Sequence, residues 1–383
     1  MADHSGTSGR LGHWIHQHFL WLMVGSYAIA ACVPAPGLWI REVAWHVAFP
    51  GFGTMKVSLS MLMLTALLLN AGLGVDIAHL RKLARNPWPL CVGLLANLVI
   101  PVVFIFAVTR AMGSWHNADE VQSILVGLAL VGSMPIAGSS TAWAQNADGE
   151  LALSLGLVLF STLLSPLTTP LALHSVGLMA SGEYATDLHE LAGGGTGMFL
   201  TLCVLAPSLI GIALRPAIGP KRIAAAKPRL KLLNSLVLLT LNYSNASVSL
   251  PQVFRDFDAD FLAITLGIVT TLCVLTFTAG GVISRVLKGS PAERASLMFG
   301  LGMNNNGTGM VLASLTLAHH PRVMLPIIFY NLVQHLVAGL VDRRFTPNAR
   351  PGHQAPEGIR QDRLHDKAVH PSMPGYLEAA TGR

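Results

Sequence analysis

Charged side chains are scarce in this chain. Asp, Glu, Lys and Arg make up 11% of its 383 residues, whereas 52% of the residues are hydrophobic. Soluble domains carry roughly 25% charged residues, so the composition excludes an ordinary soluble fold. It also excludes a disordered chain, which needs many charges and few large apolar side chains. Cysteine is scarce too, and the apolar surroundings of all four cysteines favour packing residues over a disulfide or zinc framework: Cys32, Cys91, Cys203 and Cys273.

Long stretches lack charge altogether. Ten windows of 19 residues or more contain no Asp, Glu, Lys or Arg, and together they make up about two thirds of the chain. A helix needs about 20 apolar residues to cross the hydrocarbon core, so each window can hold one crossing. The windows are continuously apolar, without the period-two alternation of barrel strands. The sequence therefore predicts an all-α polytopic membrane protein with about ten transmembrane helices, in windows 11–40, 57–75, 86–109, 121–147, 151–182, 191–214, 232–254, 261–284, 295–321 and 323–341.

Signatures of catalysis and of nucleotide binding are missing as well. The predicted spans contain no paired aspartates, no His-Glu-x-x-His and no Gly-x-Ser-Gly arrangement, which disfavours an intramembrane enzyme. No Gly-rich phosphate loop occurs anywhere, which disfavours an ATP-driven pump. We therefore expect no enzyme.

Positive charge is divided unevenly between the loops. Of the 25 Lys and Arg, 20 fall on the side of the predicted topology that carries both termini. By the positive-inside rule, both termini are cytoplasmic and the protein is integral to the plasma (inner) membrane. An alternative stays open, because Ile29 to Cys32 resembles a cleavage box, although a single Arg10 makes a poor signal n-region. Cleavage would leave nine spans.

Two predicted spans are interrupted by helix breakers and polar side chains. The fourth contains a Pro-Ile-Ala-Gly-Ser-Ser-Thr run at 135–141, and the ninth contains Gly300 to Gly309 with three consecutive asparagines. Unwound backbone in hydrocarbon costs several kcal/mol per unsatisfied group, so it survives only where it is buried in protein or lines a cavity. Transporters hold substrate and ions with such paired broken helices, whereas Gly and Pro that merely kink packed helices are the alternative.

The position of the two breaks predicts the domain organisation. Each break lies in the fourth span of a five-span half, which is the pattern of two inverted five-helix repeats. The tail contains five prolines and no apolar periodicity, which predicts disorder. We expect a cytoplasmic N-terminal segment (1–16), a first five-helix repeat (17–187), a second five-helix repeat (188–342) and a disordered cytoplasmic tail (343–383).

The residues around both breaks form specific motifs, at 134–170, 302–307 and 325–339. With these motifs the chain resembles the bile acid:sodium symporter family. The resemblance implies a panel domain of the first, second, sixth and seventh spans, and a core domain in which the broken fourth and ninth helices cross. It also implies the import of organic anions, steroidal or small carboxylates, usually with sodium.

We expect the substrate to bind where the two breaks cross. Helix halves that begin near Ser139 and Asn306 would direct their positive ends to this point. No carboxylate in the ten windows would repel an anion. The candidate substrate-binding residues are Ser139, Ser140, Thr141, Asn304, Asn305, Asn306 and His335.

The sodium sites that the resemblance implies are only partly present. Val158 stands where the family has a hydroxyl, and Gly300 stands where it has the glutamate shared by both sodium sites. A buried cation without a counter-charge is costly, so we expect sodium coupling to be weakened or absent. The remaining candidate sodium ligands are Asn97, Ser140, Thr141, Ser154 and Asn304, with backbone carbonyls from Leu301 and Met303.

The coupling ion is thus either a weakly held Na⁺ or H⁺, and no resident cofactor is expected. His335 is the one titratable side chain deep in a predicted core span, where it is a proton carrier, a donor to the substrate or simply a packing residue. We expect a secondary transporter that moves a small organic anion by alternating access. The alternative is a membrane sensor of the same fold that no longer transports. The expected partners are the organic anion and membrane lipid, with no nucleic acid and no protein partner indicated.

Overall fold

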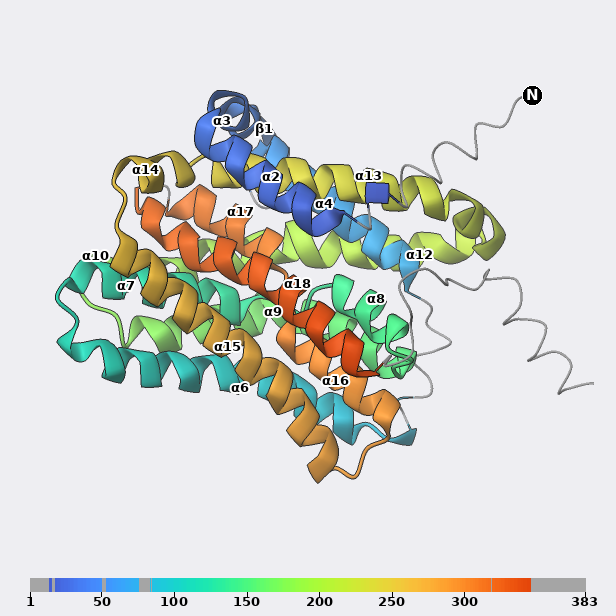
Figure 1. Cartoon of the computed structure of the whole chain (residues 1–383). Coiled ribbons are helices and arrows are strands. Elements are labelled where there is room, and N and C mark those ends of the chain that lie inside the picture. Colours follow the sequence, from blue (N-terminus) through green and yellow to red (C-terminus); the bar gives the residue numbers. More distant parts are fainter. Residues whose placement is uncertain are drawn as a thin grey trace, which may run out of the picture. The chain divides into compact units, whose positions relative to one another are not determined.

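The computed structural model describes residues 14–15, 18–49, 53–75, 83, 85–317 and 319–345. The predicted disordered tail from residue 346 onward, and most of the predicted N-terminal segment, lie outside the described residues. The described residues are mostly helical (Figure 1).

Five helices of the described part are long and apolar enough to cross a membrane, and a bent helix pair makes a sixth candidate. The predicted fourth and ninth spans do not qualify by length because each is divided into two short helices by its break. The count of ten spans therefore stays a prediction. The five long segments are Trp88–Ser114, Leu151–Gly177, Thr196–Ile218, Ala259–Val286 and Pro321–Phe345.

The first predicted span is bent, which sequence patterning did not predict. Helix α2 (Phe19–Cys32) and helix α3 (Ala35–Glu42) meet at 92°. Pro34 and Pro36 explain the bend, since proline restricts the preceding residue and removes a backbone donor. An antiparallel hairpin of β1 (Ala44–Phe49) and β2 (Gly53–Ser58) follows, so the fold departs from purely α at this point.

One group of helices is formed by α2, α3, α4 (Leu59–Gly74), α12 (Ala206–Ile218) and α13 (Pro220–Ala246). Helix α4 packs against α12 and α13, and α13 packs along α2 and α3 (Figure 1). The α4–α12 contact depends on two glycines. A methyl group at Gly72 would approach the Ser208 carbonyl oxygen to 2.1 Å, and one at Gly211 would approach the Leu69 carbonyl oxygen to 2.2 Å. Small residues let membrane helices pack this closely.

A second group packs around α7 (Ala118–Ser133), which is buried on nearly all sides. Helix α6 contacts α7 and α9, and α15 contacts α16 and α18 (Figure 1). The resemblance implies a panel domain and a core domain, and the division of this chain into them stays a prediction. The bounds are α6 Trp88–Ala111, α8 Ser139–Asn146, α9 Leu151–Gly177, α15 Ala259–Val286, α16 Pro291–Gly302, α17 Asn306–Thr316 and α18 Met324–Phe345.

Short helices join these elements, and several large apolar side chains on the long helices are exposed, as lipid-facing residues are. Trp21, Trp88, Leu167 and Val286 are examples. The short elements between the long segments are α10 (Gly182–Glu190), η3 (Leu191–Gly195) and α14 (Leu250–Arg255), whereas η2 (Met112–Ser114), α11 (Thr196–Leu200), η4 (Thr201–Leu205) and η5 (Pro321–Val323) belong to the long segments themselves. Of these, η3 and η4 are π-helical turns on either side of α11.

Candidate functional site at the crossing of two broken helices

The two predicted breaks meet and bond to each other. Helix α7 ends at Ser133 and α8 begins at Ser139, while α16 ends at Gly302 and α17 begins at Asn306. Between them, Ile136 and Asn304 form an isolated antiparallel bridge. The Ala137 amide donates to the Met303 carbonyl at 2.9 Å, and the Asn305 amide donates to the Pro135 carbonyl at 2.9 Å. Each break thus satisfies part of the other's free backbone, which explains how unwound chain is tolerated here.

Side chains from α9 hold the first break open. The Ser161 hydroxyl accepts a hydrogen bond from the Ile136 amide at 3.0 Å, and the Thr169 hydroxyl donates to the Ser133 carbonyl at 2.6 Å. These bonds replace the helical bonds that the Met134–Gly138 segment lacks. Two hydroxyl residues on α9 therefore hold this segment in its extended form.

Side chains from α18 hold the second break in the same way. The Gln334 side-chain oxygen accepts from the Asn304 amide at 3.0 Å, and the Tyr330 hydroxyl donates to the Gly302 carbonyl at 3.2 Å. Gln334 also donates to Asn331 at 3.3 Å, and Asn331 donates to the Tyr27 hydroxyl on α2 at 2.8 Å. A buried polar chain thus leads from the crossing to α2.

The three consecutive asparagines have different environments. The Asn304 side-chain amide donates to the Val131 carbonyl at 3.0 Å, so it fastens the end of α7. The Asn305 side-chain oxygen accepts from the Thr308 amide at 3.3 Å and caps α17. Asn306 is 1% exposed, and neither polar atom of its side chain has a hydrogen-bond partner among the described residues.

The predicted serine and threonine residues lie at the start of α8. Ser139 is exposed, whereas Ser140 is fully buried and its hydroxyl has no partner among the described residues. The Thr141 hydroxyl accepts from Ser154 at 3.2 Å. Six of the seven predicted substrate residues therefore lie within the bridge or at the helix starts beside it.

His335 is the exception. Its ring packs edge-on against Phe19 of α2, with ring centres 6.0 Å apart. Its neighbour Gln334 is the residue that bonds to the crossing. Sequence reasoning selected the titratable residue of this span, whereas the amide beside it makes the contact. The i, i+3 pair of Asn331 and Gln334 in an apolar span was the available signal.

Asn242 and Asn245 on α13 were missed by the sequence reasoning. Both are fully buried, and none of their side-chain polar atoms has a hydrogen-bond partner among the described residues. Helix α13 packs against α17, where its Leu238 and Leu241 would each lie 3.9 Å from a methyl group at Gly307. Buried polar groups are nearly always bonded, so unpartnered amides on both of these helices indicate a place for a polar ligand or ordered water.

Gly300 stands where the family has a glutamate, and a leucine side chain fills the space beside it. A methyl group at Gly300 would lie 2.8 Å from the Leu157 side chain. Leu157 belongs to a cluster that we call the leucine cluster, against which Val158 also packs. The cluster consists of Leu90, Ile136, Leu153, Leu157, Leu297 and Leu301.

The other sodium candidates are only partly assembled. Thr141 and Ser154 are in contact, and Asn97 lines a small hollow beside Met134 and Pro135. The Met303 carbonyl already accepts the Ala137 amide. Hard oxygen ligands and a counter-charge are what a sodium ion requires, and an apolar cluster supplies neither. The residues around Gly300 thus do not fit the sodium site that the family resemblance implies.

A model described as "Sodium Bile acid symporter family" matches residues 61–255, just over half of the chain. The chain belongs to this family. Its family is one of membrane transporters. This membership does not favour the alternative of a sensor that no longer transports. The matched region covers the first break and ends before the second.

Three relatives are similar to this chain, and two of them are named as transporters. A protein of Bacillus subtilis (strain 168) named "Uncharacterized protein YbaS" is 28% identical over 70% of this chain and 82% of its own length. "Uncharacterized sodium-dependent transporter YocS" of the same organism is 22% identical, over 80% of this chain and 88% of its own. "Probable sodium/metabolite cotransporter BASS2, chloroplastic" of Oryza sativa subsp. japonica is 24% identical, over 64% of this chain and 54% of its own.

Proposed function

We propose that this protein is a secondary transporter that moves an organic anion, a bile-acid-like steroid or a small carboxylate, by alternating access. The observation that carries the proposal is the bridge between the two breaks, with α8 and α17 both beginning beside it. Helix N-termini carry partial positive charge and free amides, so a pair of them suits a carboxylate or sulfonate.

The substrate contacts the crossing on the side of α13. Asn306 contributes an unpartnered amide from α17, and Asn242 and Asn245 contribute two more from α13. A ligand that accepts hydrogen bonds from these groups removes the cost of leaving them unsatisfied. Ser139 and Ser140 extend the polar lining at the start of α8, and Asn304 and Asn305 hold the backbone in place beneath it.

Coupling to sodium is weak or absent in this member of the family. The leucine cluster fills the position beside Gly300, and Val158 replaces a ligand hydroxyl. The oxygens of Asn97, Ser140, Thr141, Ser154 and Asn304 would form at most a neutral cage. Protons are then the alternative driving ion, with His335 as the residue to test.

Transport in proteoliposomes tests this function directly. We expect uptake of a radiolabelled conjugated bile acid or of pyruvate when no sodium is present, and stimulation by an inward proton gradient. Protein with Asn306→Leu is the matched control, because it should fold and fail to take up the probe. Uptake that needs millimolar sodium and ignores a pH gradient would contradict the proposed coupling. Absence of uptake of both probes under every gradient would contradict the proposed substrate class.

The topology is part of the proposal. Ten spans in two inverted repeats, with both termini cytoplasmic, place Glu183 outside and Lys227 inside, and both side chains are exposed. Single cysteines at these positions, in a chain without its four native cysteines, should react differently with an impermeant reagent in intact cells. Glu183→Cys should be labelled and Lys227→Cys should not. Labelling of Lys227→Cys before cell lysis would contradict the topology.

A further inference from the structure

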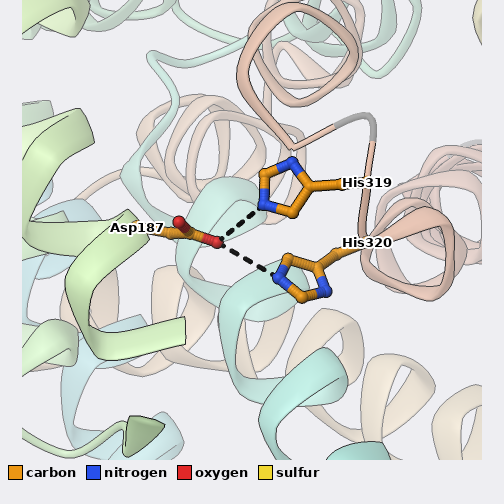
Figure 2. A group of neighbouring side chains, drawn as sticks. All are labelled: Asp187, His319 and His320. Carbon is orange, nitrogen blue, oxygen red and sulfur yellow. Dashed lines mark hydrogen bonds and ion pairs between the residues drawn. The ribbon is translucent and has the colours of Figure 1, made fainter. Parts of the chain in front are cut away.

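A group of metal-ligating side chains lies outside the two breaks. Asp187 comes from α10, and His319 and His320 come from the turn between α17 and α18. Figure 2 shows both imidazole rings directing a nitrogen to the same carboxylate oxygen. The Nε2 atoms of His319 and His320 are each 3.3 Å from Oδ2 of Asp187.

These separations match the edges of a metal coordination sphere. Zinc binds imidazole nitrogen and carboxylate oxygen at about 2.0–2.2 Å, so two ligands of a tetrahedral ion lie roughly 3.3–3.5 Å apart. All three ligand atoms lie within 4.8 Å of one another. Charge-assisted hydrogen bonds are shorter, about 2.7–2.9 Å from nitrogen to oxygen. His319 makes a long hydrogen bond to Asp187 at 3.3 Å, and both His–Asp separations are longer than those of charge-assisted pairs.

The surroundings hold one histidine in a fixed orientation. The His320 ring stacks on Tyr184 with ring centres 4.3 Å apart, and the Tyr184 hydroxyl donates to Asp119 at 2.8 Å. Nε2 of His320 is buried and makes no hydrogen bond of acceptable geometry among the described residues. A buried nitrogen that faces a carboxylate without a proper hydrogen bond is what a metal-ligand position provides.

Other groups nearby are already engaged. Glu120 is 1% exposed and accepts hydrogen bonds from Trp115 at 2.8 Å and Asn117 at 2.7 Å, and Arg322 lies 3.6 Å from it. This carboxylate is thus neutralised and does not compete for the ion.

We propose that Asp187, His319 and His320 bind a divalent transition-metal ion of the zinc class. Two imidazoles and one carboxylate favour zinc over calcium or magnesium, which prefer oxygen ligands alone. His319 is 58% exposed, so the ion can enter from solvent, and water fills the fourth position. The ion connects residues 132 positions apart in the chain and fastens α10 to the α17–α18 turn.

Zinc titration of the purified full-length chain tests the site. The terminal segments contain other histidines, namely His4, His13, His16, His353, His365 and His370, so background binding is measured in every variant. We expect wild type to bind one zinc ion that Asp187→Asn, His319→Ala and His320→Ala bind at least about tenfold more weakly, since even outer-shell changes cost 10–100-fold. Cobalt in place of zinc should give the visible absorption of a tetrahedral site in wild type and not in these three variants.

His116→Ala is the matched control. His116 faces Asp260 with 3.4 Å between Nε2 and Oδ2, and the described residues place no second histidine beside that pair. This variant should keep the wild-type zinc affinity. Elution volume and melting temperature without metal establish that each variant folds, and the exposed position of His319 makes His319→Ala the safest of the three. Equal zinc binding by wild type and His319→Ala would overturn the proposal. A wild-type cobalt spectrum in the Asp187→Asn, His319→Ala and His320→Ala variants would overturn it too.

Discussion

On the side of the crossing toward α9 and α16, leucine side chains pack into an apolar cluster around Gly300. On the side toward α13, the amides of Asn242, Asn245 and Asn306 are buried without hydrogen-bond partners among the described residues. The leucine cluster offers a cation neither hard oxygen ligands nor a counter-charge, whereas the asparagine side chains offer hydrogen bonds to a polar ligand. If the proposed function is right, ion coupling and substrate binding are separable properties of the fold.

The largest effect should come from returning a carboxylate to the leucine side. Gly300→Glu alone should destabilise the protein, because its first side-chain atom would lie 2.8 Å from Leu157. A Leu157→Ala background should make room for the glutamate, because the atoms nearest to a methyl group at Gly300 all belong to Leu157. A charge–charge interaction of about 4 kcal/mol at 4 Å and effective dielectric 20 corresponds to nearly three decades of sodium affinity. Sodium-dependent thermal stabilisation measures it.

Gly300→Gln in the same Leu157→Ala background is the control for this change. It has nearly the volume of glutamate without the charge, so it should gain little sodium dependence. Equal sodium affinity in the glutamate and glutamine variants would mean that the lost charge does not explain the weakened coupling. Strong sodium dependence in the unmodified chain would contradict the contrast itself.

The second-largest effect distinguishes the role of Asn304 from that of Asn306. Asn304→Leu should lower the free energy of unfolding by about 1–3 kcal/mol, because the Val131 carbonyl loses its donor. Asn306→Leu removes amide groups that have no partner, so the fold should tolerate it. Its ligand affinity should instead fall about 10–100-fold, the value of one or two hydrogen bonds to a charged ligand. Chemical denaturation and ligand-induced stabilisation are measured on both variants. Equal affinity in Asn306→Leu and wild type would place the substrate elsewhere.

The sequence predicted the positions of the two breaks better than the roles of the residues within them. The starts of α8 and α17, at Ser139 and Asn306, follow from helix breakers in apolar windows. Which asparagine fastens α7 and which stays unpartnered depends on where the Val131 carbonyl lies in the folded protein. The spacing of residues within one span does not show this position.

The missed features have similar causes. Asn242 and Asn245 lie in an unbroken helix, so a search for breaks passes over them, although their polarity in an apolar window was visible. The α2–α3 bend was missed because Pro34 and Pro36 lie inside one charge-free window. The hairpin that follows is short and carries Lys56, so it read as a loop.

A third and smaller effect concerns the two buried asparagines of α13, Asn242 and Asn245. Asn242→Leu and Asn245→Leu should each weaken ligand stabilisation about tenfold, the value of one hydrogen bond of about 1.4 kcal/mol. Neither change should lower stability, because no protein hydrogen bond among the described residues is lost. Thr240→Val is the control on the same helix, since Thr240 is half-buried and its hydroxyl donates to the Leu236 carbonyl at 2.9 Å within that helix. If the asparagine variants keep the affinity of Thr240→Val, α13 does not line the binding site.

The smallest effect should come from His335. Its ring contacts Phe19 of α2 and lies off the crossing, so His335→Gln should leave ligand affinity unchanged. Gln334→Leu, at the next position, is the comparison. It should lower the free energy of unfolding by about 1–3 kcal/mol, because the Asn304 backbone amide loses its acceptor. If protons drive transport through His335, His335→Gln loses the stimulation of uptake by a pH gradient and keeps exchange of labelled for unlabelled anion at equal pH. A loss of ligand affinity as large as that of Asn306→Leu would instead place His335 in the binding site.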